Sequence, residues 1–252
     1  MILTTISAVI ITYNEERNIE RLLLSIKDVV DEIIVVDSFS TDNTKKICAA
    51  YPVKFIEHQW EGYANTKNFA NSLAQSDFIL SLDADEALSE ELKQSILKEK
   101  SKGLEGVYEF NRLTNYCGKW IKHGGWYPDK KIRIFPKNKA KWQGDFVHET
   151  LIIANDLKVN FLKGDLLHYS YYNENEHYER IKKYAQLSAQ ELYNNQKKYS
   201  SIKGYLSALS KFIKMYIIDL GILDGKQGFI IAKISAYGAY LKYQLLKALN
   251  EQ

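Results

Sequence analysis

Carboxylates at the end of one predicted strand are the residues best placed for chemistry. The stretch 77–86 is an apolar run that ends in Asp83-Ala84-Asp85-Glu86. In an open α/β sheet, ligands bind outside the carboxyl ends of the strands. Two aspartates separated by one small residue suit a divalent cation that also binds phosphate oxygens. The alternative is that these acids only begin the helix predicted next, whose first turn favours negative charge. That alternative explains the glutamates of the helix better than it explains Asp83 and Asp85.

Alternating strands and helices predict the sheet that would carry these carboxylates. Apolar runs alternate with segments of helical spacing four times in the first 100 residues, with short connections. This alternation is typical of a parallel, doubly wound sheet with right-handed crossovers. The predicted strands cover residues 6–11, 32–36, 53–57 and 78–82, and the predicted helices cover residues 16–27, 43–50, 63–74 and 90–100. Two other strand ends carry polar groups, Thr12 to Glu15 and Asp37, which a parallel sheet would place at the same edge.

The second half of the chain has a different pattern. Residues 106–113 and 130–135 alternate like antiparallel strands, and the loop 117–127 between them is rich in glycine and aromatic residues. A loop of this length inside a compact domain is usually functional. From residue 174 onward, apolar residues follow helical spacing.

These changes of pattern predict the domain organisation. We expect a catalytic domain over residues 1–173, made of a first half up to residue 100 and a second half over residues 101–173. A helical extension then covers residues 174–252. A chain of 252 residues is long enough for one large α/β domain with such an appendage.

Composition and charge narrow the class of protein. Cys48 and Cys117 are the only cysteines, which favours a reducing compartment without a disulfide framework. The amino terminus reads as a strand and not as a signal peptide. The apolar stretch 206–223 is interrupted by charged residues and is too short to span a membrane. Residues 176–252 hold 12 Lys and Arg against 6 Asp and Glu, which favours an anionic partner for the tail.

Four motifs in register resemble glycosyltransferase family 2. Each is short, but their order along the chain is specific to that family. They are Ile11-Thr12-Tyr13-Asn14-Glu15, Val35-Val36-Asp37 with Ser40-Thr41-Asp42, Lys67-Asn68, and Leu82-Asp83-Ala84-Asp85-Glu86. The resemblance implies a glycosyltransferase-A fold, a Rossmann-like mixed sheet that binds nucleotide-diphosphosugars. Many members have a second Asp after the one matched by Asp37, and here Ser38 follows it.

Later motifs resemble the subgroup that builds lipopolysaccharide cores. They are Lys122 to Lys130 with Arg133, Trp142-x-Gly144, and Val147-His148-Glu149. Members of this subgroup include β-1,4-glucosyltransferases. The Gln-x-x-Arg-Trp motif of processive synthases is absent from the sequence. The resemblance therefore implies an inverting, non-processive, metal-dependent transferase that moves one sugar, with glucose from UDP-glucose as the expected donor, to a lipopolysaccharide or lipooligosaccharide core or a related glycan.

The resemblance also implies roles for individual residues. The implied metal ligands are Asp85 and His168, for Mn²⁺ or Mg²⁺, although a histidine at a strand end is often only structural. The implied general base is Glu149, with Glu86 and Asp129 as alternatives. The residues implied to bind the nucleotide-sugar donor are Thr12, Tyr13, Asn14, Glu15, Asp37, Lys67, Asp83 and Asp85.

Acceptor binding is expected in the glycine- and aromatic-rich loop. Trp126, Tyr127 and Asp129 are the candidates, because aromatic rings stack on sugar faces. The alternative is that Trp126 is an ordinary core residue. Two other functions remain open from the sequence alone: an inactive binding module of the same fold, and a nucleotidyltransferase. The latter normally has a glycine-rich loop after the first strand, and Thr12 to Arg17 contains no glycine.

The tail leaves two interpretations open. Its positive charge and its many aromatic residues favour contact with the inner face of the inner membrane, where a lipid-linked acceptor would lie. The alternative is a helical cap or a homodimer contact. In either case we expect a cytoplasmic protein that binds no nucleic acid.

Overall fold

Four parallel strands form the first half of the main sheet in the computed structural model, which describes residues 4–144 and 149–251. The strands are β1 (Ile6–Thr12), β2 (Glu32–Asp37), β3 (Lys54–Glu57) and β4 (Phe78–Asp83), in the spatial order β3-β2-β1-β4. The parallel register pairs Thr12 with Asp37 and Ile11 with Asp83. The predicted parallel sheet is therefore confirmed, and three of its strands end on the polar residues expected at the functional edge.

Antiparallel strands complete the sheet. Beyond β4 the order continues β8-β6-β11-β5, and β7 pairs with β6, which gives nine strands within the described residues. A separate antiparallel hairpin consists of β9 and β10. The bounds are β5 (Glu86–Leu88), β6 (Val107–Tyr116), β7 (Lys119–Ile121), β8 (Lys130–Pro136), β9 (Ala140–Gln143), β10 (Thr150–Ile153) and β11 (Val159–Tyr171). The predicted change from parallel to antiparallel pairing is confirmed. Residues 86–88 form a short strand that pairs with β11, so Asp83 and Asp85 do not belong to the first turn of a helix.

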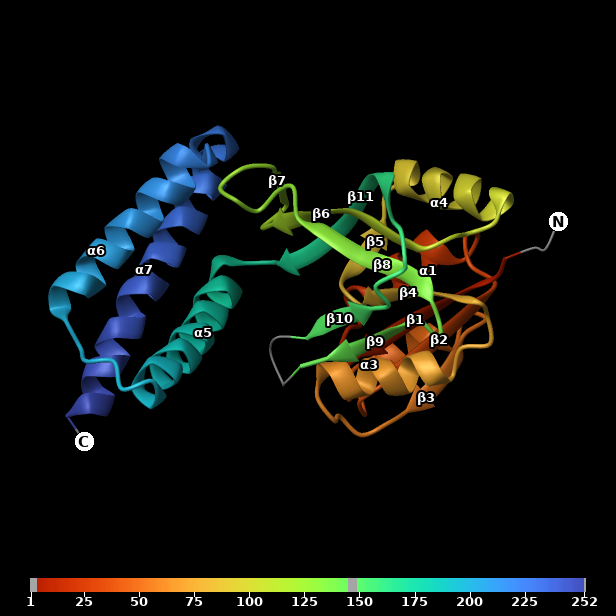
Figure 1. Ribbon diagram of the computed structural model, residues 1–252, viewed down its shortest axis with the longest axis horizontal. Coiled ribbons are helices and arrows are strands. Elements are labelled where there is room, and N and C mark those ends of the chain that lie inside the picture. The colour runs from red at the N-terminus through yellow and green to blue at the C-terminus, as the bar shows by residue number, and fades with distance from the viewer. Residues whose placement is uncertain (1–3, 145–148, 252) are drawn as a thin grey trace. The chain divides into compact units, whose positions relative to one another are not determined.

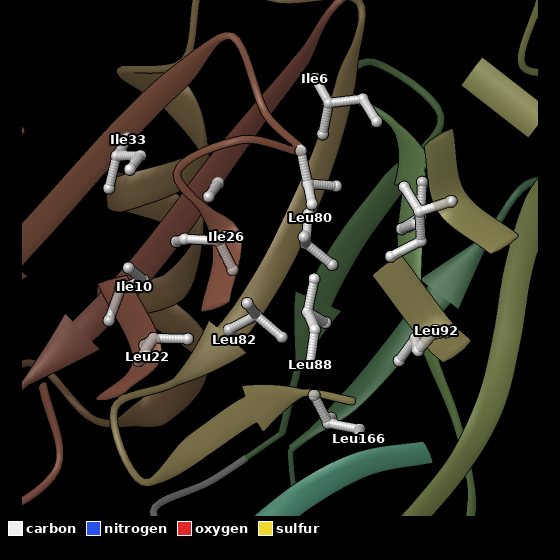
Figure 2. Packing of buried hydrophobic residues seen from close by; sticks show 14 of the residues in the cluster. Ile6, Ile10, Leu22, Ile26, Ile33, Leu80, Leu82, Leu88, Leu92 and Leu166 are labelled. Carbon is white, nitrogen blue, oxygen red and sulfur yellow. The ribbon is translucent and has the colours of Figure 1, made fainter. Parts of the chain in front are cut away.

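Helices cover both faces of the sheet because its central strands are apolar on both sides. The helices here are α1 (Ile19–Ile26), α2 (Thr44–Cys48), α3 (Tyr63–Ser72) and α4 (Glu90–Lys102). On one face, Ile6, Ile10 and Leu80 of the strands pack with buried residues of α1 and α4 (Figure 2). On the other face, Val9, Ile11 and their neighbours pack against α3. Alternate residues of one strand thus enter different cores.

The chain divides into two compact units. Unit 1 comprises residues 1–112 and 129–168, and unit 2 comprises residues 113–128 and 169–252. Unit 2 therefore takes the aromatic loop together with the C-terminal helices. The functional boundary that we expect at residue 173 stays a prediction.

Unit 2 is built around its last helix. Its elements are α5 (Glu174–Asn194), α6 (Ser201–Ile213), the π-helical η1 (Lys214–Ile218), the short 3₁₀ helix η2 (Gly221–Asp224) and α7 (Gly225–Asn250). Both α5 and α6 pack along α7 (Figure 1). Tyr116, Ile121 and Tyr171 form a small core with Met215 and Ile231. No described helix is both long enough and apolar enough to cross a membrane.

Candidate active site

A buried lysine connects two of the predicted site carboxylates in unit 1. Lys67 lies on α3, and its side chain is only 2% exposed. Its Nζ lies 2.9 Å from Asp83 Oδ1 at the end of β4 and 3.2 Å from Glu149 Oε1, next to β10. The ammonium group also lies 4.6 Å from the centre of the Trp142 ring, at cation–π distance. The structure therefore brings three predicted residues together: Lys67, Asp83 and Glu149.

A second buried cation holds the other oxygen of Asp83. Arg133 Nη2, on β8, lies 2.9 Å from Asp83 Oδ2 and 2.6 Å from Glu86 Oε1. Burial opposes the charge of Asp83, but the charges of Lys67 and Arg133 outweigh burial and hold the pKa of Asp83 below its ordinary value. Asp83 is therefore an ionised acceptor at neutral pH. Glu86 is fully buried and also accepts the Asp83 backbone N–H at 3.0 Å, so it supports the strand end and is not placed to serve as a base.

Replacing Arg133 by methionine is expected to destabilise the protein by about 3–5 kcal/mol, because the buried Glu86 would lose its nearer charged partner and keep Arg112 at 3.7 Å. Denaturant unfolding of the Arg133→Met protein measures this loss. The matched control is Lys45→Met, which breaks the exposed Lys45–Glu57 ion pair and should cost less than about 1 kcal/mol. Similar losses for both variants would contradict the supporting role of Arg133.

Asp85 and His168 meet at the same edge of the sheet. His168 Nε2, on β11, lies 3.2 Å from Asp85 Oδ2. Glu15 lies near these carboxylates. Burial raises its pKa, and the negative charges of Asp85, Asp42 and Asp83 raise it further, while a hydrogen bond from Asn18 lowers it. The gathered negative charge that raises the pKa of Glu15 also forms an environment that suits a cation.

The residues at this edge fit a shared metal ion and do not form a closed cage. Within residues 4–144 and 149–251, no group of three or more His, Cys, Asp or Glu side chains could hold a metal alone. Asp85 and His168 offer one carboxylate oxygen and one imidazole nitrogen. Mg²⁺ commonly takes one or two protein carboxylates and completes its shell with substrate phosphates and water. The predicted pair is therefore sufficient for an ion that is bound together with a diphosphate.

The loops after β1 and β2 are tied to each other. Asn14, at φ 55°, accepts the Thr41 N–H at 2.8 Å, and its own N–H donates to Ser40 Oγ at 2.8 Å. Asp37 accepts both the N–H and the hydroxyl of Ser40. Asp37 is fully buried, so in this conformation it fixes the loop, and its contact with a nucleotide base stays a prediction.

Two other donor candidates face opposite environments. Tyr13 is 58% exposed, whereas Thr12 is buried. The Thr12 hydroxyl finds no hydrogen-bond partner in the part of the chain that the structure describes. A buried hydroxyl without a partner is rare, which fits a position where a bound ligand supplies the missing bond.

The acceptor candidates lie in different surroundings. Trp126 belongs to unit 2, where its ring packs near Tyr116, Tyr171 and His177, so it has the core position named as its alternative. Tyr127 lies in the same unit and is half-buried. Their contact with an acceptor stays a prediction. Asp129 belongs to unit 1, and its carboxylate is held by Arg112 at 2.8 Å and Lys131 at 2.9 Å.

The contacts of Arg133 with Asp83 and of Trp142 with Lys67 were not predicted from the sequence, which offered Trp142 only as a side chain that could stack on a sugar. Both appear in the motifs, but nothing in those motifs placed a buried guanidinium on Asp83 or an indole beside Lys67. A signal was present, since an arginine inside the apolar strand Lys130–Pro136 needs an acidic partner when it is buried. Val147 and His148, which also belong to the motifs, lie outside the described residues.

Comparisons with known proteins identify the family. The sequence profile of glycosyl transferase family 2 matches residues 7–155, more than half of the chain. An uncharacterised glycosyltransferase of Rickettsia typhi is 30% identical, and the match covers 97% of this chain and 87% of the relative. The lipopolysaccharide core biosynthesis glycosyltransferase LpsC of Rhizobium meliloti is 27% identical, with coverage of 94% and 89%. Among solved structures, TarS of S. aureus in complex with UDP-GlcNAc has a TM-score of 0.49 at 16% identity, with coverage of 99% and 92%.

The family match agrees with the mixed sheet described above, and it includes every predicted site residue except His168, which lies on β11. It confirms the glycosyltransferase-A fold and the enzyme class expected from the motifs. The nucleotidyltransferase alternative does not agree with it. The chain belongs to glycosyltransferase family 2.

Proposed function

We propose that the enzyme transfers one glucosyl unit from UDP-glucose, with inversion, to a hydroxyl of a lipopolysaccharide or lipooligosaccharide core. The observation that carries this proposal is the position of Glu149. Its carboxylate is joined through Lys67 to Asp83, at the strand end where the motifs predict donor binding. Similarity to LpsC, whose name assigns it to lipopolysaccharide core biosynthesis, supports the acceptor class.

Glu149 acts as the general base in this proposal. It takes the proton from the acceptor hydroxyl while that oxygen attacks the sugar from the face opposite the diphosphate. Lys67 holds the carboxylate at 3.2 Å and restricts its orientation. Half-burial of Glu149 leaves its side chain accessible to an acceptor.

Donor binding is assigned to the strand ends. Asp83, ionised between two cations, accepts hydroxyl groups of the donor ribose, and the tied loops after β1 and β2 enclose the base. Asp85 and His168 would hold Mn²⁺ or Mg²⁺, which when bound stabilises negative charge on the departing diphosphate.

Thermal unfolding tests the donor assignment. UDP-glucose at about 100 times its Kd, with Mn²⁺ or Mg²⁺, should stabilise the protein by about 2.7 kcal/mol. For a chain of this size, that corresponds to a rise of about 5–10 °C in Tm. GDP-mannose, and UDP-glucose with a chelator, are the controls and should give much smaller shifts. A larger shift with another nucleotide would contradict UDP-glucose as donor.

Unit 2 is assigned a contact with the membrane that carries the acceptor. Large apolar residues recur at helical spacing on one face of α6, and they are exposed to solvent, with Ile202 at 69%. We call these residues the α6 strip: Ile202, Leu206, Leu209 and Ile213. Exposed isoleucines and leucines continue through the turn that follows, at residues 217–223. Apolar patches of this extent on a soluble surface usually mark an interaction site. Lys203, Lys211 and Lys214 accompany the strip, as is typical of helices that lie on anionic membranes.

Co-sedimentation with phosphatidylglycerol vesicles tests this contact. The protein should pellet at low salt and be released in part by added salt, because exposed charges are screened. Leu206→Glu should abolish pelleting, whereas Leu187→Glu, an exposed leucine of α5 outside the strip, should not. A protein that stays in the supernatant but sediments as a dimer disrupted by Leu206→Glu would assign the strip to a homodimer instead.

A further inference from the structure

A groove runs along α7 between α5 and α6, entirely within unit 2. Its volume is about 790 Å³, within the range of pockets that bind small molecules. The floor is made by small residues of α7, Ser235, Gly238 and Ala239. Gly238 allows α5 to approach there, because a side chain at this position would collide with Ile181. The groove therefore exists because α7 is narrow where the other two helices pack on it.

The groove is lined by apolar and aromatic side chains together with serine hydroxyl groups, and its charged side chains are all basic. Its apolar surface includes Tyr184 of α5 and Met215 of η1, together with Trp126 and Tyr171. Lys211, Lys214 and Lys242 also line the groove. No aspartate or glutamate is found among the described residues that line it.

Two of the three lysines carry charge without a neutralising partner. Lys214 forms an ion pair with Asp219 at 2.7 Å. In the part of the chain with described placement, Lys211 and Lys242 have no carboxylate at ion-pair distance, and Lys242 lies 5.0 Å from the centre of the Tyr243 ring. His177 adds no charge, because burial and the charge of Arg180 lower its pKa to about 4. The groove thus combines apolar and aromatic surface with two available ammonium groups.

We propose that this groove binds one lipid with a phosphate headgroup, whose phosphate contacts Lys211 and Lys242 and whose chain lies along Tyr184, Met215 and Trp126. Charge complementarity selects an anion, since ammonium groups form strong charge-assisted hydrogen bonds with phosphate. The apolar lining selects an anion that carries a hydrocarbon chain. This site is distinct from the α6 strip. The proposal rests on the proposed membrane contact, because the membrane would supply the lipid.

Methionine NMR provides a direct test, because the sequence contains only two methionines, Met1 and Met215. Met215 is buried and lines the groove. In full-length protein with ¹³C-labelled methionine methyl groups, dihexanoylphosphatidylglycerol below its micelle concentration should shift the Met215 signal in a saturable way. The Met1 signal is the internal reference, and Met215→Leu assigns the peaks.

Variants test the charged and the apolar parts separately. Lys211→Gln with Lys242→Gln should raise the apparent Kd about tenfold or more, whereas Lys226→Gln with Lys233→Gln, both exposed and outside the groove, should leave it within about twofold. Ala239→Phe should weaken binding by filling the groove without changing charge. Equal weakening by the control pair would mean general charge attraction and would overturn the site.

Other ligands and the vesicle assay separate the remaining outcomes. An unchanged Met215 signal, or an equal response to glycerol phosphate or to dihexanoylphosphatidylcholine, would overturn an anionic lipid as ligand. A Met215 shift that appears on raising protein concentration without lipid would assign the groove to a second copy of the chain. If vesicle binding persists while Met215 does not respond, the groove proposal fails and the membrane contact stands. If Leu206→Glu abolishes vesicle binding but keeps the Met215 shift, the groove is confirmed independently.

Discussion

Asp85→Ala is expected to reduce transfer by about 10³-fold or more. Asp85 follows the end of β4 and lies 3.2 Å from His168, and these two residues are assigned to the metal. A bound divalent ion contributes several kcal/mol of charge stabilisation in reactions of this kind, and each 1.36 kcal/mol corresponds to a factor of ten in rate. Steady-state transfer assays with saturating Mn²⁺ or Mg²⁺ measure the effect. Donor affinity should fall strongly in the presence of metal and change little in its absence.

The control for this variant is Asp28→Ala, an exposed aspartate at the end of α1. It should retain full activity. His168→Ala should show a smaller loss than Asp85→Ala, because an imidazole ligand is neutral and does not offset the charge of the ion. Unchanged turnover and unchanged metal-dependent donor affinity in Asp85→Ala would remove Asp85 from the metal site and leave the pair with a structural role.

Glu149→Gln is expected to lower kcat by about 10²–10⁴-fold, the range for a lost general base. The substitution keeps the size of the side chain and leaves an oxygen for Lys67, so the fold and the donor affinity should be preserved. Single-turnover measurements separate the chemical step from donor binding. Circular dichroism and the Tm shift with donor report whether the protein remains folded and able to bind.

Glu57→Gln is the matched control, since Glu57 pairs with Lys45 on the surface of β3. Its activity should equal that of the parent protein. If Glu149→Gln retained activity within a few-fold, the base would be another carboxylate. Asp129 would then be the next candidate, because Glu86 is buried in an ion pair with Arg133. Asp129→Asn would test that assignment.

The parallel half of the fold was predictable because its signals are local. Each strand there is a continuous apolar run with a polar residue at its end, so Thr12, Asp37 and Asp83 could be placed at one edge before the structure was known. The predicted strand bounds differ from the observed ones by one residue at most. Lys67 was also expected near the donor, from the motif that places it on a helix between the third and fourth strands.

The environment of these residues was less predictable because it depends on long-range pairing. The contact of Arg133 with Asp83 requires β8 to lie antiparallel to β4, and no local pattern selects that neighbour. Similarly, the sequence cannot show that Asn14 accepts a hydrogen bond from Thr41, since the two loops meet only in the folded sheet. Motifs thus identified the residue types, whereas the structure identified which charges neutralise one another.

The discontinuous composition of unit 2 limits how this enzyme can be rearranged by recombination. Residues 113–128 supply Tyr116 and Ile121 to a core that also contains Tyr171, Met215 and Ile231 from the C-terminal part of the chain. A crossover that exchanged only residues 169–252 for those of a relative would place side chains from two different proteins in one core, where their shapes do not fit each other. Chimeras that also carry residues 113–128 from the same relative should express as folded protein more often. Divergence in this family would then leave correlated substitutions between the two segments.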